Sequence, residues 1–185
     1  MVMEAEAEAE ARNALRLGHE LSGALGVETA IAVNALCSIF ILQERFHDVL
    51  ELTARALENL ETAGAHPRSF VVTQLKLQRA LAQAASGDWP AAAASYAALE
   101  QALAEGGAAL RGTLALEGAR VLAYHRTGQA VRATAALKDE LAWKLRVHGD
   151  EAVEAVEARV LAAALAGDGA ALRQGLSRLM AMGTA

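Results

Sequence analysis

One phrase of nine residues recurs three times in this chain at almost constant spacing. The copies are RALAQAASG, which ends at Gly87, RVLAYHRTG, which ends at Gly128, and RVLAAALAG, which ends at Gly167. Each begins with arginine and ends with glycine, and the glycines lie 41 and then 39 residues apart. A period of this length is typical of helical repeat proteins. The chain is therefore predicted to consist of copies of one structural unit.

Each glycine is predicted to end a helix, and the residues around the phrase are aligned as well. The residue five positions after the glycine is small or apolar and the residue nine positions after it is large, so the two share one helix face. These residues are Ala92, Ala133 and Leu172, and then Tyr96, Leu137 and Leu176. The unit is thus helix, glycine turn, helix, and stacked copies would bury the apolar face that a single copy leaves exposed.

An earlier, degenerate copy is predicted in LCSIFILQERFHDVLELTARAL, residues 36–57. Glu44 stands there in the place of the glycine. Val49 has the expected apolar character five residues later, and Thr53 is a weaker match to the large residue four positions beyond.

The composition predicts an all-α protein, because alanine, leucine, glutamate and arginine dominate and all favour helices. Breakers mark about nine helices, and their short connections make neighbours antiparallel. We expect a right-handed stack of antiparallel helical hairpins, with a closed helical bundle as the alternative. The expected domain is 1–185, with an N-terminal helix at 1–26 and hairpins at 27–66, 67–107, 108–148 and 149–185. The first turns of the first helix, EAEAEAEA, have no apolar stripe and are expected to be solvated.

Two segments resemble the tetratricopeptide repeat: ALAQAASGDWPAAAASYAALEQAL and VLAYHRTGQAVRATAALKDEL. The first has the family's order of glycine, aspartate, aromatic residue, alanine and large residue at Gly87, Asp88, Trp89, Ala92 and Tyr96. The second departs from it, since Gln129 and Ala130 follow Gly128. A unit of about 40 residues and the connection ENLETAGAHPRSF resemble the longer-helix branch of the family. The resemblance spans 27–182 and implies an α-solenoid that binds proteins or peptides in a groove lined by the first helix of each hairpin.

Charge and composition argue against several classes of partner. The net charge is −5 and there is no basic run, which disfavours nucleic acid. No apolar run approaches about 18 residues, so no membrane span is expected. The acidic start, MVMEAEAEAEAR, does not look like a signal peptide, and a cytoplasmic location is expected. The single cysteine, Cys37, lies in an apolar run and is predicted to be a buried, inert thiol.

The recurring arginines are the sharpest candidates for binding. Equivalent positions line up in a stack, and the planar guanidinium suits carboxylates, so a row of arginines could hold an acidic peptide or a chain terminus. The alternative is that these arginines are solvated or pair with nearby acids, as Arg120 could with Glu117. The predicted partner-binding residues are Arg79, Arg120, Arg159, Lys76, Gln83 and Tyr124.

No pattern in the sequence indicates catalysis or metal binding. There is no GxSxG elbow, no HExxH motif and no helical pair of histidines three or four residues apart. We expect no catalytic residues, no metal and no cofactor, and hence no enzyme.

The last helix, DGAALRQGLSRLMAMG, keeps an apolar stripe that no later helix covers. A bare end of a solenoid indicates self-association through terminal helices, or a piece of a longer array. The sequence thus predicts a scaffold that binds another protein or peptide. The alternative is a sensor or oligomerisation module of a bacterial transcriptional or signalling regulator.

Overall fold

The computed structural model describes residues 2–106 and 118–183, and every element in these residues is an α-helix. Nine helices are present in this part of the chain, which confirms the all-α prediction. The chain divides into two compact units, Met1–Ala115 and Leu116–Ala185. Each unit is described by itself, and the single continuous stack expected from the sequence stays a prediction.

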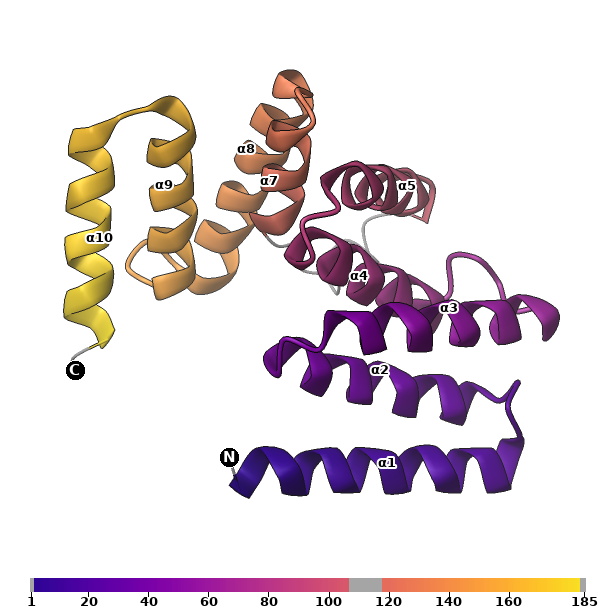
Figure 1. Cartoon of the computed structure of the whole chain (residues 1–185). Coiled ribbons are helices and arrows are strands. Elements are labelled where there is room, and N and C mark those ends of the chain that lie inside the picture. The colour runs from indigo at the N-terminus through magenta and orange to yellow at the C-terminus, as the bar shows by residue number, and fades with distance from the viewer. Residues whose placement is uncertain (1, 107–117, 184–185) are drawn as a thin grey trace. The chain divides into compact units, whose positions relative to one another are not determined.

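The described residues of the first unit form five helices, and each packs on the one before it in the chain. Their bounds are α1 (Val2–Ser22), α2 (Val27–Leu42), α3 (Phe46–Thr62), α4 (Phe70–Ala85) and α5 (Trp89–Gly106). In Figure 1, α2 lies between α1 and α3, and it contacts both. α4 packs on α3, on α5 and also on α2. The first helices of two successive hairpins, α2 and α4, are therefore in contact.

In the second unit the described residues form four helices, and each packs on the next in chain order. Their bounds are α7 (Gly118–Arg126), α8 (Ala130–His148), α9 (Val153–Ala166) and α10 (Gly169–Gly183). The predicted start of the helix that ends before Gly128 lies outside the described residues. At the N-terminus, α1 ends at Ser22, four residues before the end of the segment predicted for it, 1–26. Gly23 ends it because this residue turns into the left-handed region, with φ of 73°.

The repeated phrase ends in the same turn each time. Gly87, Gly128 and Gly167 have φ of 81°, 73° and 70°. The glycine N–H donates to the carbonyl three residues back, and the next N–H donates to the carbonyl five residues back. This pair of bonds is the Schellman motif, which favours glycine because a Cβ is strained at positive φ. Glu44 takes the same conformation, with φ of 58°, and its turn has the same two bonds.

Large apolar side chains fill the core of the first unit. Leu36, Phe40, Leu60, Leu75 and Tyr96 are all buried, and they come from all helices of this unit except α1.

Cys37 lies in the same core and is fully buried, as predicted. Burial raises the pKa of its thiol to about 12, because the charged thiolate loses hydration there. The thiol is therefore kept in its unreactive, protonated form at neutral pH.

Alanine dominates the buried positions of the second unit. The buried alanines are Ala123, Ala133, Ala136, Ala155, Ala158 and Ala163. Val121, Tyr124 and Val156 are the buried residues with larger apolar side chains in the described part of this unit. Two charged residues, Arg120 and Glu140, are buried with them, and the ammonium of Lys144 lies 3.1 Å from a carboxylate oxygen of Glu140.

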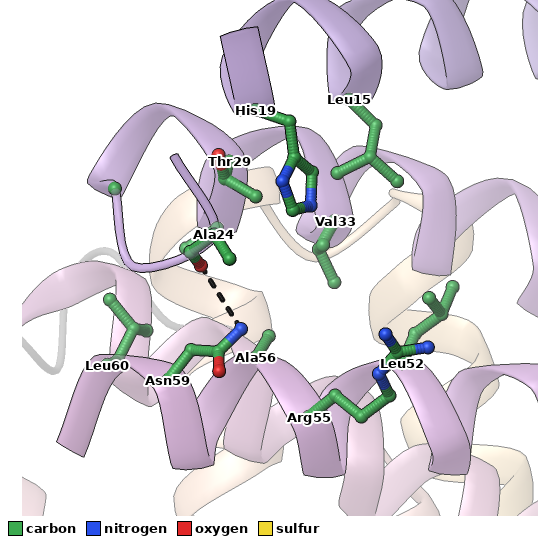
Figure 2. A pocket seen from close by; sticks show the side chains of 12 residues that line it. Leu15, His19, Ala24, Thr29, Val33, Leu52, Arg55, Ala56, Asn59 and Leu60 are labelled. Atoms are coloured by element: carbon green, nitrogen blue, oxygen red, sulfur yellow. Dashed lines mark hydrogen bonds between the residues drawn. The ribbon is translucent and has the colours of Figure 1, made fainter. Parts of the chain in front are cut away.

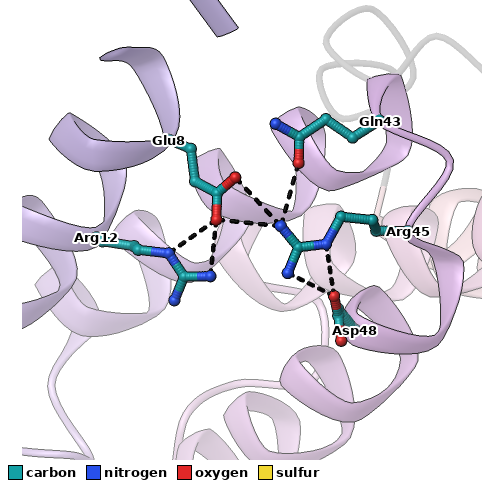
Figure 3. Close-up of polar contacts among 5 residues, drawn as sticks. All are labelled: Glu8, Arg12, Gln43, Arg45 and Asp48. Atoms are coloured by element: carbon teal, nitrogen blue, oxygen red, sulfur yellow. Dashed lines mark hydrogen bonds and ion pairs between the residues drawn. The ribbon is translucent and has the colours of Figure 1, made fainter. Parts of the chain in front are cut away.

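A polar cluster fastens α1 to the turn between α2 and α3 (Figure 3). The Arg45 guanidinium donates to both carboxylate oxygens of Glu8 at 3.1 Å and to Asp48 at 2.7 Å. The same group stacks 3.9 Å from the ring centroid of Phe40. The expectation that the EAEAEAEA segment is only solvated is therefore wrong at Glu8, because Arg45 and Arg12 both bind its carboxylate.

Candidate binding surfaces

The three arginines of the repeated phrase have three different environments. Arg79 lies on α4 in the first unit, whereas Arg120 on α7 and Arg159 on α9 belong to the second. Their equivalent positions in the sequence give equivalent positions within each helix. The groups that surround them differ.

Arg120 is only 3% exposed. One of its terminal nitrogens donates a hydrogen bond of 3.0 Å to the carbonyl oxygen of Ala136, which joins α7 to α8. Tyr124, one turn further along α7, is also fully buried. These two predicted binding residues are thus packed inside the second unit. Arg120 therefore does not take part in an accessible row of arginines.

Arg159 is directed at the loop that precedes its own helix. Its guanidinium donates to the backbone carbonyl of Asp150 at 3.1 Å and pairs with the side-chain carboxylate of the same residue. This pairing matches the alternative in which the arginines bind nearby acids. A partner's carboxylate would have to displace Asp150.

Lys76, Arg79 and Gln83 share one face of α4 and are half-buried. The Gln83 carbonyl oxygen accepts a 2.7 Å hydrogen bond from the hydroxyl of Ser95 on α5, so this face lies beside α5. Among the residues that the structure describes, neither Lys76 nor Arg79 forms an ion pair. The structure thus brings these three predicted residues together and leaves two cations without a local counter-charge.

A further surface follows one side of α2. Val27, Ile31 and Leu42 are 52%, 55% and 82% exposed, and their spacing returns each to nearly the same side of the helix. From Thr29 to Gln43 the chain carries no charged residue at all. We call this exposed side the α2 stripe; besides the three large residues it contains Ala35 and Ser38. The Gln78 amide on α4 donates to the Ser38 hydroxyl at 2.8 Å, so the stripe adjoins α4.

A pocket opens on a different side of α2, between α1 and α3 (Figure 2). Its volume is about 140 Å³. The lining residues are Leu15 and His19 of α1, Ala24 and Gly26 of the following turn, Thr29, Ala30 and Val33 of α2, and Leu52, Arg55, Ala56, Asn59 and Leu60 of α3.

Four of the lining residues have polar side chains: His19, Thr29, Arg55 and Asn59. Figure 2 shows the imidazole of His19 reaching from α1 toward Val33, with Arg55 on the opposite wall. The Asn59 amide donates to the carbonyl oxygen of Ala24 at 3.1 Å and so joins α3 to the turn after α1. Neither the pocket nor the α2 stripe was among the predicted sites. The sequence contains a signal for the stripe, namely an apolar run that carries no charged residue.

Within 2–106 and 118–183, no cluster of three or more histidine, cysteine or acidic side chains has a geometry that could hold a metal ion. None of the helices in these ranges combines the length and apolarity needed to cross a bilayer.

Comparisons of the chain with protein-family models, with curated proteins and with solved structures find no match.

Proposed function

We propose that this chain is a helical-hairpin module that binds another protein or a peptide along α2 and α4. The observation that carries the proposal is that α2 has a highly apolar sequence with no charged residue from Thr29 to its end, although one side is exposed to solvent. A helix that is hydrophobic all round is normally buried. The α2 stripe is therefore a surface that a partner would cover.

Three side chains of the α2 stripe would supply most of the binding energy. Complete burial of a fully exposed side chain of this size stabilises a complex by about 1.5–3 kcal/mol. Leu42 is 82% exposed and would contribute most of this amount, whereas Val27 and Ile31 are about half exposed and would each contribute about half of it. The small residues between them, Ala35 and Ser38, allow a partner helix or extended segment to approach closely.

The resemblance to the tetratricopeptide repeat supports the same surface. In that family the first helix of each hairpin lines the binding groove, and in this chain those helices are α2 and α4. The Schellman turns at Glu44 and Gly87 and the contact between α2 and α4 support a stack of hairpins within the first unit. A binding role for Lys76 and Arg79 would add a preference for acidic partners, since both cations lack an ion-pair partner among the described residues.

A capture experiment from lysate of the source cells tests the proposal. The wild-type chain is compared with the double variant Ile31→Asp/Leu42→Asp and with Lys76→Glu/Arg79→Glu. A control, Val131→Asp, introduces a single aspartate at an exposed valine of α8. Circular dichroism verifies that all variants fold.

We expect the α2 variant to lose a partner that the wild type and the Val131 control retain. Loss of the same partner by the Lys76/Arg79 variant would identify it as acidic. Equal capture by the wild type and the α2 variant would contradict the proposed surface.

A second candidate function, self-association as an oligomerisation module of a regulator, is favoured by α10. None of its described side chains is buried, and Leu176 and Met180 are 45% and 74% exposed. Light scattering of the wild type and of Leu176→Asp/Met180→Asp would test it. A dimer that the substitutions dissociate would support the second function, and a monomeric wild type would contradict it.

A further inference from the structure

We propose that the pocket between α1, α2 and α3 is a binding site for a small carboxylate with an apolar body the size of one aromatic ring. This inference goes beyond protein binding along the α2 stripe, because the pocket and the stripe use different sides of α2.

The interior of the pocket suits an apolar group. Ala30, Val33, Ala56 and Leu60 are buried in its floor, and Leu15 and Leu52 form part of its walls. The volume of about 140 Å³ is close to that of aliphatic cavities that accept benzene, which are about 150 Å³. The space exists because alanines stand at two floor positions.

Backbone contacts hold the pocket open at one end. Gly18 of α1 lies against the backbone of Thr29, where an added Cβ would be only 3.1 Å from the Thr29 Cα and nitrogen. The Thr29 hydroxyl donates to the carbonyl of Gly23 at 2.8 Å, and Asn59 binds the same turn from α3. The walls are therefore fixed by hydrogen bonds and by a close helix approach, and do not depend on a ligand for their spacing.

The ionisable side chains at the opening of the pocket favour an anionic ligand. The ionisable residues in the lining are His19 and Arg55, on opposite walls, and no carboxylate lines the pocket. Within the described residues, the imidazole of His19 forms no hydrogen bond, and its N–H can donate to a ligand. Arg55 has one local acid, Glu51, at 4.0 Å, and both side chains are mostly exposed. Such a surface pair contributes little, so a ligand carboxylate can replace Glu51.

Titration of isotope-labelled full chain with sodium benzoate, followed by amide NMR, tests the proposal. We expect saturable shifts at the Asn59 side-chain amide and at the backbone amides of Val33 and Ala56. A ligand with this few atoms should bind with a Kd of about 1 mM. Benzyl alcohol should bind about tenfold more weakly, and benzylamine should not bind.

Three variants distinguish the contribution of the Arg55 charge to binding from that of the cavity volume. Arg55→Met keeps most of the apolar stem and should weaken benzoate binding about threefold to tenfold. Arg146→Met removes an exposed arginine of α8 and should leave the affinity unchanged. Ala56→Leu fills the floor and should abolish binding of both benzoate and benzyl alcohol. Equal affinity for benzoate and benzyl alcohol, unchanged affinity in Arg55→Met, or no saturable shift in the wild type would each overturn the proposal.

Discussion

The two units use the same helices and turns but fill their interiors with different side chains. Leu75 in α4 and Ala155 in α9 occupy equivalent positions, four residues before the arginine of the phrase, and both are fully buried. The first unit buries several leucines, Phe40 and Tyr96. The second unit buries mainly alanines, together with Arg120 and Glu140. The repeat thus specifies where helices begin and end and which side of each helix faces the interior. The size of the buried side chains sets the stability of each unit.

The largest effect on stability should come from substitutions at these two equivalent positions. Leu75→Ala removes a buried leucine and should lower the free energy of unfolding by about 2–5 kcal/mol. Ala155→Gly, in the alanine-packed unit, should cost only about 1 kcal/mol. Urea unfolding followed by circular dichroism measures both. Equal losses would show that the two cores do not differ in the way their composition indicates.

The next largest effect on stability should come from the buried charges of the second unit. Lys144→Met leaves the buried carboxylate of Glu140 without its ammonium neighbour, and should destabilise the unit by about 2 kcal/mol. This is below the roughly 3–5 kcal/mol of a fully buried pair, because Lys144 remains partly exposed. The same substitution in a Glu140→Gln background should cost much less. A loss of the same size in both backgrounds would mean that Lys144 contributes through its methylenes and not through its charge.

Substitutions in two of the turns should change the stability of the first unit by smaller amounts and in opposite directions. Glu44→Gly should stabilise the first unit by about 1 kcal/mol, since it relieves a side chain held at positive φ. Gly87→Ala should destabilise it by about the same amount. No atom lies within 4 Å of an added Cβ at Gly87, so that cost would report backbone strain alone. Thermal unfolding compares the two, and a destabilising Glu44→Gly would contradict the assignment of Glu44 to the glycine position.

The smallest effect is the pH dependence of the Glu8 cluster. Hydrogen bonds from Arg12, and then from Arg45, lower the pKa of Glu8 below its usual value of about 4.3. A carboxylate with a lowered pKa stabilises the fold above its unfolded-state pKa, and this stabilisation is lost as the pH falls through the folded-state value. The stability difference between wild type and Glu8→Gln should therefore shrink below a pH of about 4. A difference that stays constant under acid would exclude this linkage.

Most of the fold follows from local sequence signals. The glycine at the end of each phrase predicts the left-handed turn, and the alignment of Glu44 with those glycines correctly placed a turn where no glycine stands. Asp88 and Asp168 directly precede α5 and α10, where aspartate is a favoured N-cap residue, and their carboxylates accept hydrogen bonds from the third following N–H, of Ala91 and Ala171. These features depend on neighbours within a few residues.

The candidate sites depend on contacts that the repeat does not specify. Arg120 resembles Arg79 in the sequence, but it is buried because α8 supplies the Ala136 carbonyl. The sequence contains one indication that this position can be buried. In the degenerate copy an apolar residue, Leu36, stands in the place of the arginine, and Leu36 is buried too. The pocket could not be predicted, because its walls come from three helices and its space reflects the packing of Ala30 and Ala56.

The alanine-rich interior of the second unit has a consequence for its response to temperature. Heat capacity on unfolding scales with the apolar surface that becomes exposed, and alanine buries little of it. The stability of this unit should therefore vary less steeply with temperature than that of the first, with a shallower maximum and a broader melting transition. One chain built on a single repeat would then contain a sharply melting part and a gradually melting part.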